Sequence, residues 1–177
     1  MSMLLHVCCG PCATGAVPFW ERRGKEVIGF FFNPNIHPFF EHRRRLTSTR
    51  EAAEHAHLRL EVDDSYDPEA WFAAVASGEG SRCERCIGMR LRRAGEKAVA
   101  LGCEAFSTSL SISPWQDHEA IRVQGEKAGR ALGITFMYED LRPQYAESRN
   151  ASRKLGLYTQ KYCGCLMSEQ ERYGGRS

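Results

Sequence analysis

The sequence predicts an α/β fold in which one parallel five-stranded sheet is sandwiched by helices. Short apolar runs alternate with longer segments of helical character along the 177-residue chain, as in proteins built from β-α units. Residues 27–32 are apolar without interruption, which is typical of a strand buried on both faces. A hydrophobic content of 42% is sufficient for one core. We therefore expect residues 1–177 to form a single domain.

In the first part of the chain, each expected element is delimited by turn or helix-boundary residues. Pro11 suits the first turn of a helix and Gly24 suits its end. Asn33-Pro34-Asn35 has the composition of a turn and should stop the second strand. The expected elements are a strand over residues 4–7, a helix over 11–23, a strand over 27–32, a helix over 38–57 and a strand over 58–62.

The later elements follow the same signals. Asp67-Pro68 is a favourable helix start, and Gly102 and Gly133 are expected to end helices. The expected elements are helices over residues 67–76 and 83–101, a strand over 104–110, a helix over 117–132, a strand over 134–138, and a tail of helix and loop over 144–173. In parallel sheets of this kind, ligands bind beyond the carboxyl ends of the strands. Cys8, Asn33 and Ser109 follow three of the expected strands, so this edge should carry the site.

Seven of the eight cysteines fall in three clusters, which are Cys8-Cys9-Gly-Pro-Cys12, Cys83-x-x-Cys86 and Cys163-Gly-Cys165. Thiolates bind iron–sulfur clusters and soft metals, and thiol pairs carry electrons as disulfides. The CxxC pair at a helix start would complete four thiolates with Cys8 and Cys9, the number that a 4Fe-4S cluster needs. The CxC pair could close a strained disulfide or ligate a metal, and the sequence does not choose between them. Cys103 stands alone and is expected in the core.

The charged residues are less specific. The net charge is only +2, but arginines crowd residues 43–50 and 82–93, which suits phosphate contacts and equally suits solvated helix faces. Among the histidines, His37 is the best functional candidate because its loop should lie at the carboxyl edge of the sheet. Asp117 and Tyr158 are further candidates for proton transfer or substrate contact. No Walker A or dinucleotide-binding glycine motif is present. No signal peptide or apolar span of membrane length is evident, so we expect a cytoplasmic protein without a membrane partner.

Five motifs in one order resemble the QueH-type epoxyqueuosine reductases, a cobalamin-independent family. They cover the chain from Leu4 to about Ser168 and are Leu4-Leu-His-Val-Cys-Cys-Gly-Pro-Cys12, Asn33-Pro-Asn-Ile-His-Pro38, Arg82-Cys-x-x-Cys-x-x-Met-Arg-Leu91, Phe106-Ser-Thr-Ser-Leu-Ser-Ile-Ser-Pro114 and Gln160-Lys-Tyr-Cys-Gly-Cys165. Typical members have Pro-His-Lys-Asn where this chain has Pro114-Trp-Gln-Asp117, which weakens inference at those positions.

The resemblance implies a fold of the adenine nucleotide alpha-hydrolase-like (PP-loop-like) group and a reaction that converts epoxyqueuosine in tRNA to queuosine, the last step of queuosine biosynthesis. It also implies one iron–sulfur reductase domain that uses an external electron donor. The implied 4Fe-4S ligands are Cys8, Cys9, Cys83 and Cys86. Cys12 matches a metal-proximal position, with room for a second mononuclear iron or zinc ion. Cys163 and Cys165 match a redox-active pair.

This hypothesis extends to substrate contacts. His37, Asp117 or Tyr158 would donate a proton when the epoxide oxygen leaves as water. An anticodon loop is bound through phosphates and stacked bases. The expected phosphate contacts are Arg43, Arg44, Arg45, Arg82, the rest of the arginine-rich helix up to Arg93, Lys154 and Lys161, and the expected stacking residues are Phe39, Phe40, Trp115 and Tyr158.

Two other interpretations remain open at this point. The cysteines could hold zinc in an RNA-binding module without redox catalysis. The chain could also be a thiol–disulfide or sulfur-transfer enzyme of PP-loop ancestry, although it lacks the phosphate loop that such an enzyme would use for ATP. A secreted disulfide scaffold is disfavoured by the length of the chain.

Overall fold

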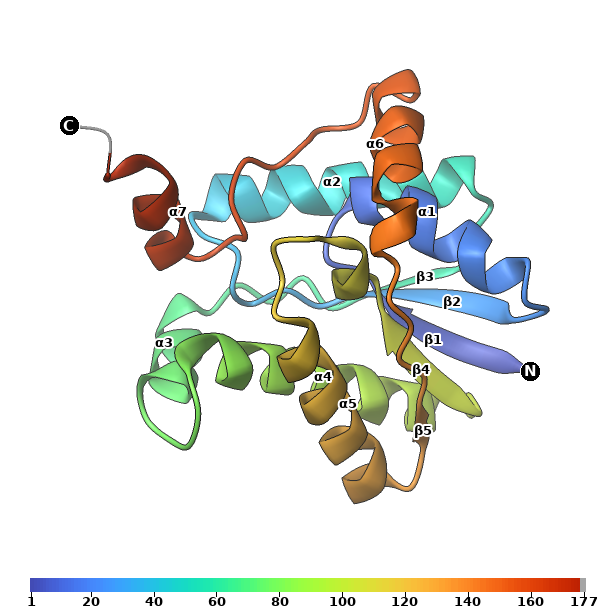
Figure 1. Ribbon diagram of the computed structural model, residues 1–177, viewed down its shortest axis with the longest axis horizontal. Coiled ribbons are helices and arrows are strands. Elements are labelled where there is room, and N and C mark those ends of the chain that lie inside the picture. The colour runs from blue at the N-terminus through green and yellow to red at the C-terminus, as the bar shows by residue number, and fades with distance from the viewer. Residues whose placement is uncertain (176–177) are drawn as a thin grey trace.

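The computed structural model describes residues 1–175, and these form a five-stranded sheet in the order β3-β2-β1-β4-β5 with every pairing parallel (Figure 1). The strands are β1 (Ser2–His6), β2 (Glu26–Phe31), β3 (Leu60–Val62), β4 (Ala105–Thr108) and β5 (Thr135–Phe136). In the centre of the sheet, Leu4 of β1 pairs with Ile28 of β2 and with Phe106 of β4. The predicted fold class is confirmed.

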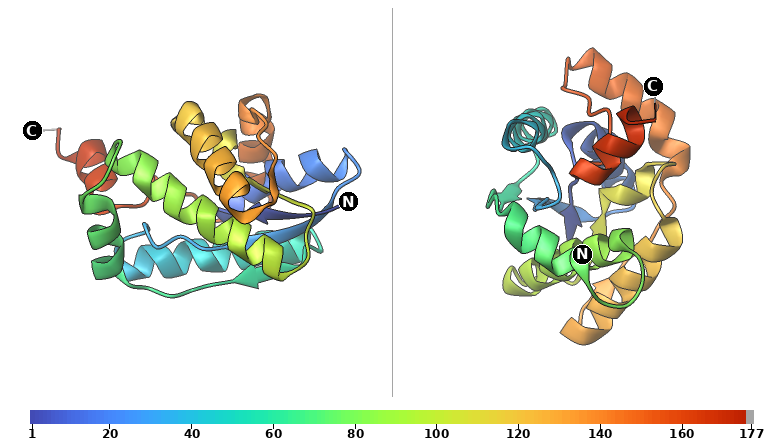
Figure 2. Two further views of the ribbon diagram at one scale, coloured as in Figure 1. Left: turned by 90° about the horizontal axis from the view of Figure 1, so that it is seen from below. Right: turned by 90° about the vertical axis from the view of Figure 1, so that its left-hand side faces the viewer.

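Helices cover both faces of the sheet (Figure 1). On one face, α1 (Gly10–Glu21) packs between α2 (Phe39–His55) and α6 (Tyr145–Lys154). On the other face, α4 (Arg82–Ala100) packs against α5 (His118–Leu132), and α3 (Pro68–Ala76) packs against α4. The tail ends in α7 (Leu166–Tyr173), which lies at the same end of the molecule as α3 (Figure 2). None of the helices within residues 1–175 combines the length and the apolar character needed to cross a membrane.

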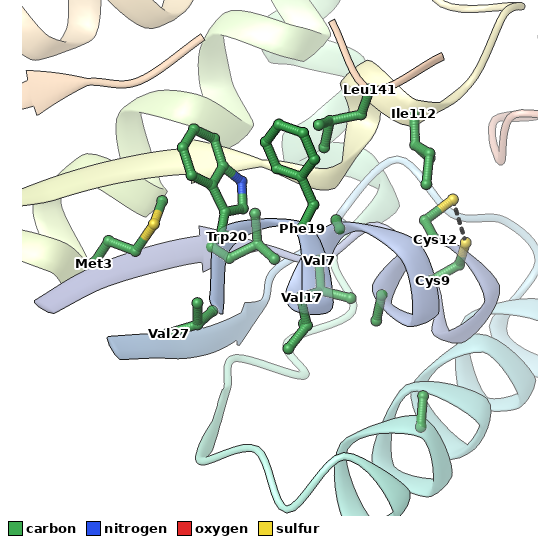
Figure 3. Close-up of a cluster of buried hydrophobic side chains, with 14 of the residues drawn as sticks. Met3, Val7, Cys9, Cys12, Val17, Phe19, Trp20, Val27, Ile112 and Leu141 are labelled. Atoms are coloured by element: carbon green, nitrogen blue, oxygen red, sulfur yellow. Dashed lines mark hydrogen bonds between the residues drawn. The ribbon is translucent and has the colours of Figure 1, made fainter. Parts of the chain in front are cut away.

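Side-chain alternation along β1 divides the interior into two cores. Met3 and Leu5 face α1 and pack with Trp20, as Figure 3 shows for Met3 and Trp20, whereas Leu4 faces the opposite core of α4 and α5 together with Phe106. Burial on both faces explains the uninterrupted apolar runs within these strands, residues 3–5 of β1 and 27–31 of β2. Cys103 belongs to the second core, as predicted.

The later strands are shorter than predicted. Thr108 ends β4 because its hydroxyl accepts a hydrogen bond from the Leu110 N–H, and residues Ser109–Ile112 then form a 3-10 turn in place of the expected strand end. The edge strand β5 pairs only with β4 and is reduced to two residues. The chain therefore turns away from the sheet early at the carboxyl end of β4, and this leaves space beside Cys8.

Candidate functional site

A cavity of about 700 Å³ lies at the carboxyl edge of the sheet, where it is bounded by all three cysteine clusters. It lies beyond the ends of β1 and β4. The strand order in the sheet changes direction between these two strands, and ligands bind at such a switch point in this fold class. Six cysteines line it, namely Cys8, Cys12, Cys83, Cys86, Cys163 and Cys165. None of the eight cysteines, all of which lie in the described part of the chain, forms a disulfide.

The first cluster forms a tight turn from β1 into α1, with Cys9 as the residue that precedes the helix. The Cys8 N–H donates to the Ser109 hydroxyl at 3.0 Å, and that hydroxyl donates to the Cys8 sulfur at 3.3 Å. The sulfurs of Cys8, Cys9 and Cys12 lie within 4.8 Å of one another, and Figure 3 shows the 3.0 Å contact between Cys9 and Cys12. This is the spacing of a shared metal site.

Three thiols so close together cannot all ionise without a positive partner, because like charges repel at this distance. Burial opposes ionisation of Cys9, but the bonds to Cys12 and Cys8 outweigh burial and hold the pKa of Cys9 well below its usual value. Bonds to Cys8 and Cys9, with burial, raise the pKa of Cys12 well above its usual value. For Cys8, the bond to Cys12 lowers the pKa, yet the bond to Cys9 and burial raise it to about 12.

The second cluster occupies the first turn of α4. Ser81 and Glu84 form a capping box, with the Ser81 hydroxyl accepting from the Glu84 N–H at 3.1 Å, and this fixes where the helix begins. Cys83 and Cys86 then lie one turn apart on one side of the helix. Cys86 is buried against Trp71 and Cys165, while Cys83 is exposed. The Arg82 guanidinium lies 4.0 Å from the Cys83 sulfur.

The third cluster lies in an extended segment, residues 158–165, that we call the strap. The buried Arg45 guanidinium donates to the carbonyl oxygens of Tyr162 and Cys163 at 3.0 and 2.7 Å. The Tyr162 hydroxyl donates to the His37 carbonyl at 2.5 Å, and the His37 N–H donates to the Gly164 carbonyl at 2.8 Å. Gln160 reaches across from the strap to the Cys9 sulfur at 3.0 Å. The strap thereby brings Cys163 to the cavity, where the Gln116 amide contacts its sulfur at 3.3 Å.

The donor set fits a thiolate-bound metal group. Helices α1, α4 and α7 all begin at cysteine clusters, and the partial positive charge of helix N-termini favours anionic sulfur. Thiol sulfurs without carboxylate ligands select zinc, copper(I) or iron–sulfur clusters. Three of the four predicted cluster ligands, Cys8, Cys83 and Cys86, line the cavity, and the fourth, Cys9, lies behind Cys12 at 3.0 Å. Only Cys8, Cys9 and Cys12 form a compact group.

The predicted proton donors differ in position. Asp117 lines the cavity, but one of its carboxylate oxygens caps α5 by accepting from the Ala120 N–H at 2.9 Å. The His37 side chain does not line the cavity; it is buried beside Trp71 and stacks on Phe72 with ring centroids 5.3 Å apart. Burial lowers the pKa of His37. The Tyr158 hydroxyl donates to Glu41 at 2.6 Å and also lies outside the cavity lining. The loop of His37 was thus predicted in the right place, but its side chain points into an aromatic cluster.

The structure corrects two predicted phosphate contacts, Arg45 and Arg90, because both are buried. Arg45 is only 2% exposed, and its guanidinium is bonded to Glu41 at 2.7 Å as well as to the strap, so it has no surface for RNA. Arg43 pairs with Asp64 on the surface, and Arg44 stacks over the Tyr158 ring. Arg82 and Lys161 do line the cavity. Arg90 also lines it, from a buried position. So do residues to which the sequence assigned no contact role, namely Arg149, Arg172, Gln116 and Gln160.

Comparison with known proteins points to one family. A family model described as Epoxyqueuosine reductase QueH matches residues 3–171. The chain is 39% identical over 172 residues to the epoxyqueuosine reductase QueH of Dehalococcoides mccartyi, covering 97% of this chain and 94% of that protein. It is 36% identical over 180 residues to the protein of the same name from Thermotoga maritima, covering 97% and 92%. Among solved structures, a predicted subunit of tRNA methyltransferase from Methanocaldococcus jannaschii matches with a TM-score of 0.57 at 10% identity, covering 86% of this chain and 74% of that one, which shows likeness of fold alone.

Proposed function

The chain belongs to the QueH family of epoxyqueuosine reductases, and from this premise we propose that it is an iron–sulfur-dependent oxidoreductase that reduces epoxyqueuosine in tRNA to queuosine. The observation that carries the proposal is the convergence of six cysteines from three separate segments on one cavity. Structural zinc requires only one closed set of about four ligands. The additional cysteines, among them the exposed Cys163, suit a site that also transfers electrons.

The reaction sets what the site must supply. Conversion of the epoxide to an alkene consumes two electrons and two protons, and the oxygen leaves as water. Cys8, Cys9, Cys83 and Cys86 would hold a 4Fe-4S cluster, which would supply electrons, and Cys12 would be available to a second metal, an iron or zinc ion. Oxidation of the Cys163 and Cys165 thiols to a disulfide releases two electrons and two protons, which an external donor must restore. Both residues adjoin the cavity.

The protons that the epoxide oxygen takes up must come from a donor that lines the cavity. Asp117 lines the cavity and is therefore better placed than His37, whose side chain is buried among aromatic rings. Burial also lowers the pKa of His37, which disfavours its protonated form. We assign proton donation to Asp117, and we assign to the main chain of His37 the role of anchoring the strap.

The mouth of the cavity suits a single-stranded RNA loop. Trp115 is 85% exposed at the rim and offers a face on which a base can stack. Lys161 and Arg172 are exposed, Arg149 is half-buried, and all three line the same cavity. With Arg82 from α4, these cations surround the opening that a splayed nucleotide would enter. Arg43, Arg44 and Lys154 remain available for phosphates farther along the RNA, and we expect binding to weaken steeply with salt.

The experiment is anaerobic purification with metal analysis, followed by turnover of epoxyqueuosine tRNA with a chemical reductant. We expect a brown protein with about four iron and four sulfide per chain. Cys83→Ala should lose the iron and the activity without unfolding, because Cys83 is exposed. Cys103→Ala is the matched control, since Cys103 lies in the second core, away from the cavity lining, and should keep both. A colourless, zinc-loaded and inactive wild type would instead indicate the zinc-stabilised RNA-binding module.

A further inference from the structure

Arg90 is a buried cation without an anionic partner among residues 1–175. It lies on α4, one turn after Cys86, and is 2% exposed. Its only hydrogen bond in the described structure runs from Nε to the Cys86 carbonyl at 3.4 Å, and no carboxylate of residues 1–175 pairs with it. Buried charges are costly unless paired. Arg45 shows the usual solution, because it is equally buried but bonds Glu41 and two carbonyl oxygens.

The groups that surround Arg90 come from all three cysteine clusters. Arg90 lines the cavity together with Cys8, Cys86 and Cys163, one residue from each cluster. Cysteines bind metals as thiolates, so a metal group held by these clusters places negatively charged sulfur beside the Arg90 guanidinium.

We propose that Arg90 is the fixed counter-charge of the cysteine centre and that it raises the reduction potential of the iron–sulfur group held there. This inference rests on the cofactor in the proposed function. One-electron reduction of the centre by an external donor adds one negative charge. A guanidinium already fixed beside the sulfurs stabilises the reduced form more than the oxidised form. Arg90 acts on the cysteine centre and not on the substrate, so it is a positioning residue and not a catalytic one.

The fold explains why this cation needs no carboxylate. Arg90 follows Cys86 by four residues on α4, so both side chains project from the same side of the helix. The capping box at Ser81 fixes the start of that helix, which places Arg90 and the two α4 cysteines in one frame. A carboxylate partner would cancel the positive charge that the thiolates would otherwise face. Exposed arginines of the same helix do pair with acids, as Arg92 does with Glu96 at 3.2 Å.

The test is the midpoint potential of the iron-reconstituted full chain, measured by spectroelectrochemical titration in wild type, Arg90→Lys, Arg90→Gln and Arg92→Gln. Loss of the charge in Arg90→Gln should shift the potential to more negative values. Arg90→Lys should have a midpoint potential close to that of wild type, because it keeps the charge. Arg92→Gln is the control on the same helix, since its side chain is 74% exposed, and it should match wild type. Iron content and thermal unfolding are measured for each variant.

Equal potentials in wild type and Arg90→Gln would overturn the inference. If Arg90→Gln loses iron that Arg90→Lys retains, the positive charge is needed to assemble the centre, which supports the inference. Equal loss of iron in both variants would overturn it, because the shape of the arginine side chain and not its charge would then be required. Turnover of epoxyqueuosine tRNA is scored separately. A shifted potential in a protein that does not reduce this substrate would leave Arg90 as the counter-charge and reject the proposed function. A wild type with no redox-active centre would reject the Arg90 assignment outright.

Discussion

Two of the three cysteine segments at the cavity are held in place by different kinds of contact. The turn at Cys8 to Cys12 is fixed by main-chain structure, because β1 pairs with strands on both sides and α1 begins directly after Cys9. The strap of residues 158–165 has no regular secondary structure. Its position depends on the Arg45 side chain from α2 and on the main chain of His37 in the loop after β2.

The two segments differ in whether they can be displaced without unfolding the protein. A change in the first turn disturbs the centre of the sheet, so the cysteines cannot move without loss of the fold. The strap can be released by removing a few hydrogen bonds while both cores stay packed, since local stability follows the density of buried contacts. This suits the proposed chemistry, because a cysteine pair that is oxidised and reduced again must meet an external donor. The following substitutions test this contrast.

The largest effect is expected from Glu41, which neutralises Arg45 inside the protein. Glu41→Leu leaves a buried guanidinium unpaired and should lower the free energy of unfolding by about 4 kcal/mol. The double variant Glu41→Leu/Arg45→Met should regain much of this loss, because both charges are gone. It still lacks the two donors to the strap, so alkylation of Cys163 should be several-fold faster than in wild type. Urea unfolding and mass spectrometry of alkylated peptides measure the two effects.

Glu51→Leu is the matched control, since Glu51 lies on the exposed side of the same helix. It should change the free energy of unfolding by no more than about 0.5 kcal/mol. If Cys163 is alkylated at the same rate in the double variant as in wild type, Arg45 does not hold the strap. The contrast between the two segments would then be wrong.

A smaller loss is expected from Gly10→Ala in the first turn. A Cβ atom at this position would collide with the main-chain carbonyl and the hydroxyl of Ser48 on α2. A backbone carbonyl cannot move aside, so we expect the free energy of unfolding to fall by about 3 kcal/mol. Gly88→Ala is the control, because its Cβ would meet only the mobile end of the Gln124 side chain. Thermal unfolding should separate the two, and a stable Gly10→Ala protein would show that the turn tolerates movement.

The fold could be predicted from the sequence because it depends on local patterns. Apolar runs, helix starts at proline and helix ends at glycine placed the elements in the correct order, and the carboxyl-edge rule brought Cys8 and Ser109 together. The strap could not be predicted in this way. Arg45 and Tyr162 are 117 residues apart, and neither lies in a pattern that refers to the other.

The error at Arg45 has a specific cause. Three consecutive arginines, residues 43–45, look like one basic patch in the sequence, but successive helical side chains point about 100° apart. One of the three therefore faces inward, and Glu41 four residues earlier could have identified it as an ion-paired side chain. Arg90 was missed for the same reason, since it was grouped with the exposed arginines of α4 although it follows the apolar side of that helix.

The smallest effect is expected from Tyr162→Phe, which removes one anchor of the strap. The hydroxyl donates to the His37 carbonyl, and its loss should lower the free energy of unfolding by about 1 kcal/mol at pH 8. Burial raises the pKa of Tyr162 to about 12, against about 10 in an unfolded chain. The unfolded chain therefore loses this proton first, so the contribution of the hydroxyl is complete below pH 10 and is lost as the pH rises to 12. Urea unfolding of wild type and variant should converge over this interval, whereas Tyr173→Phe, at an exposed position on α7, should match wild type throughout. Equal stability of Tyr162→Phe and wild type at pH 8 would mean that this hydroxyl does not help to hold the strap.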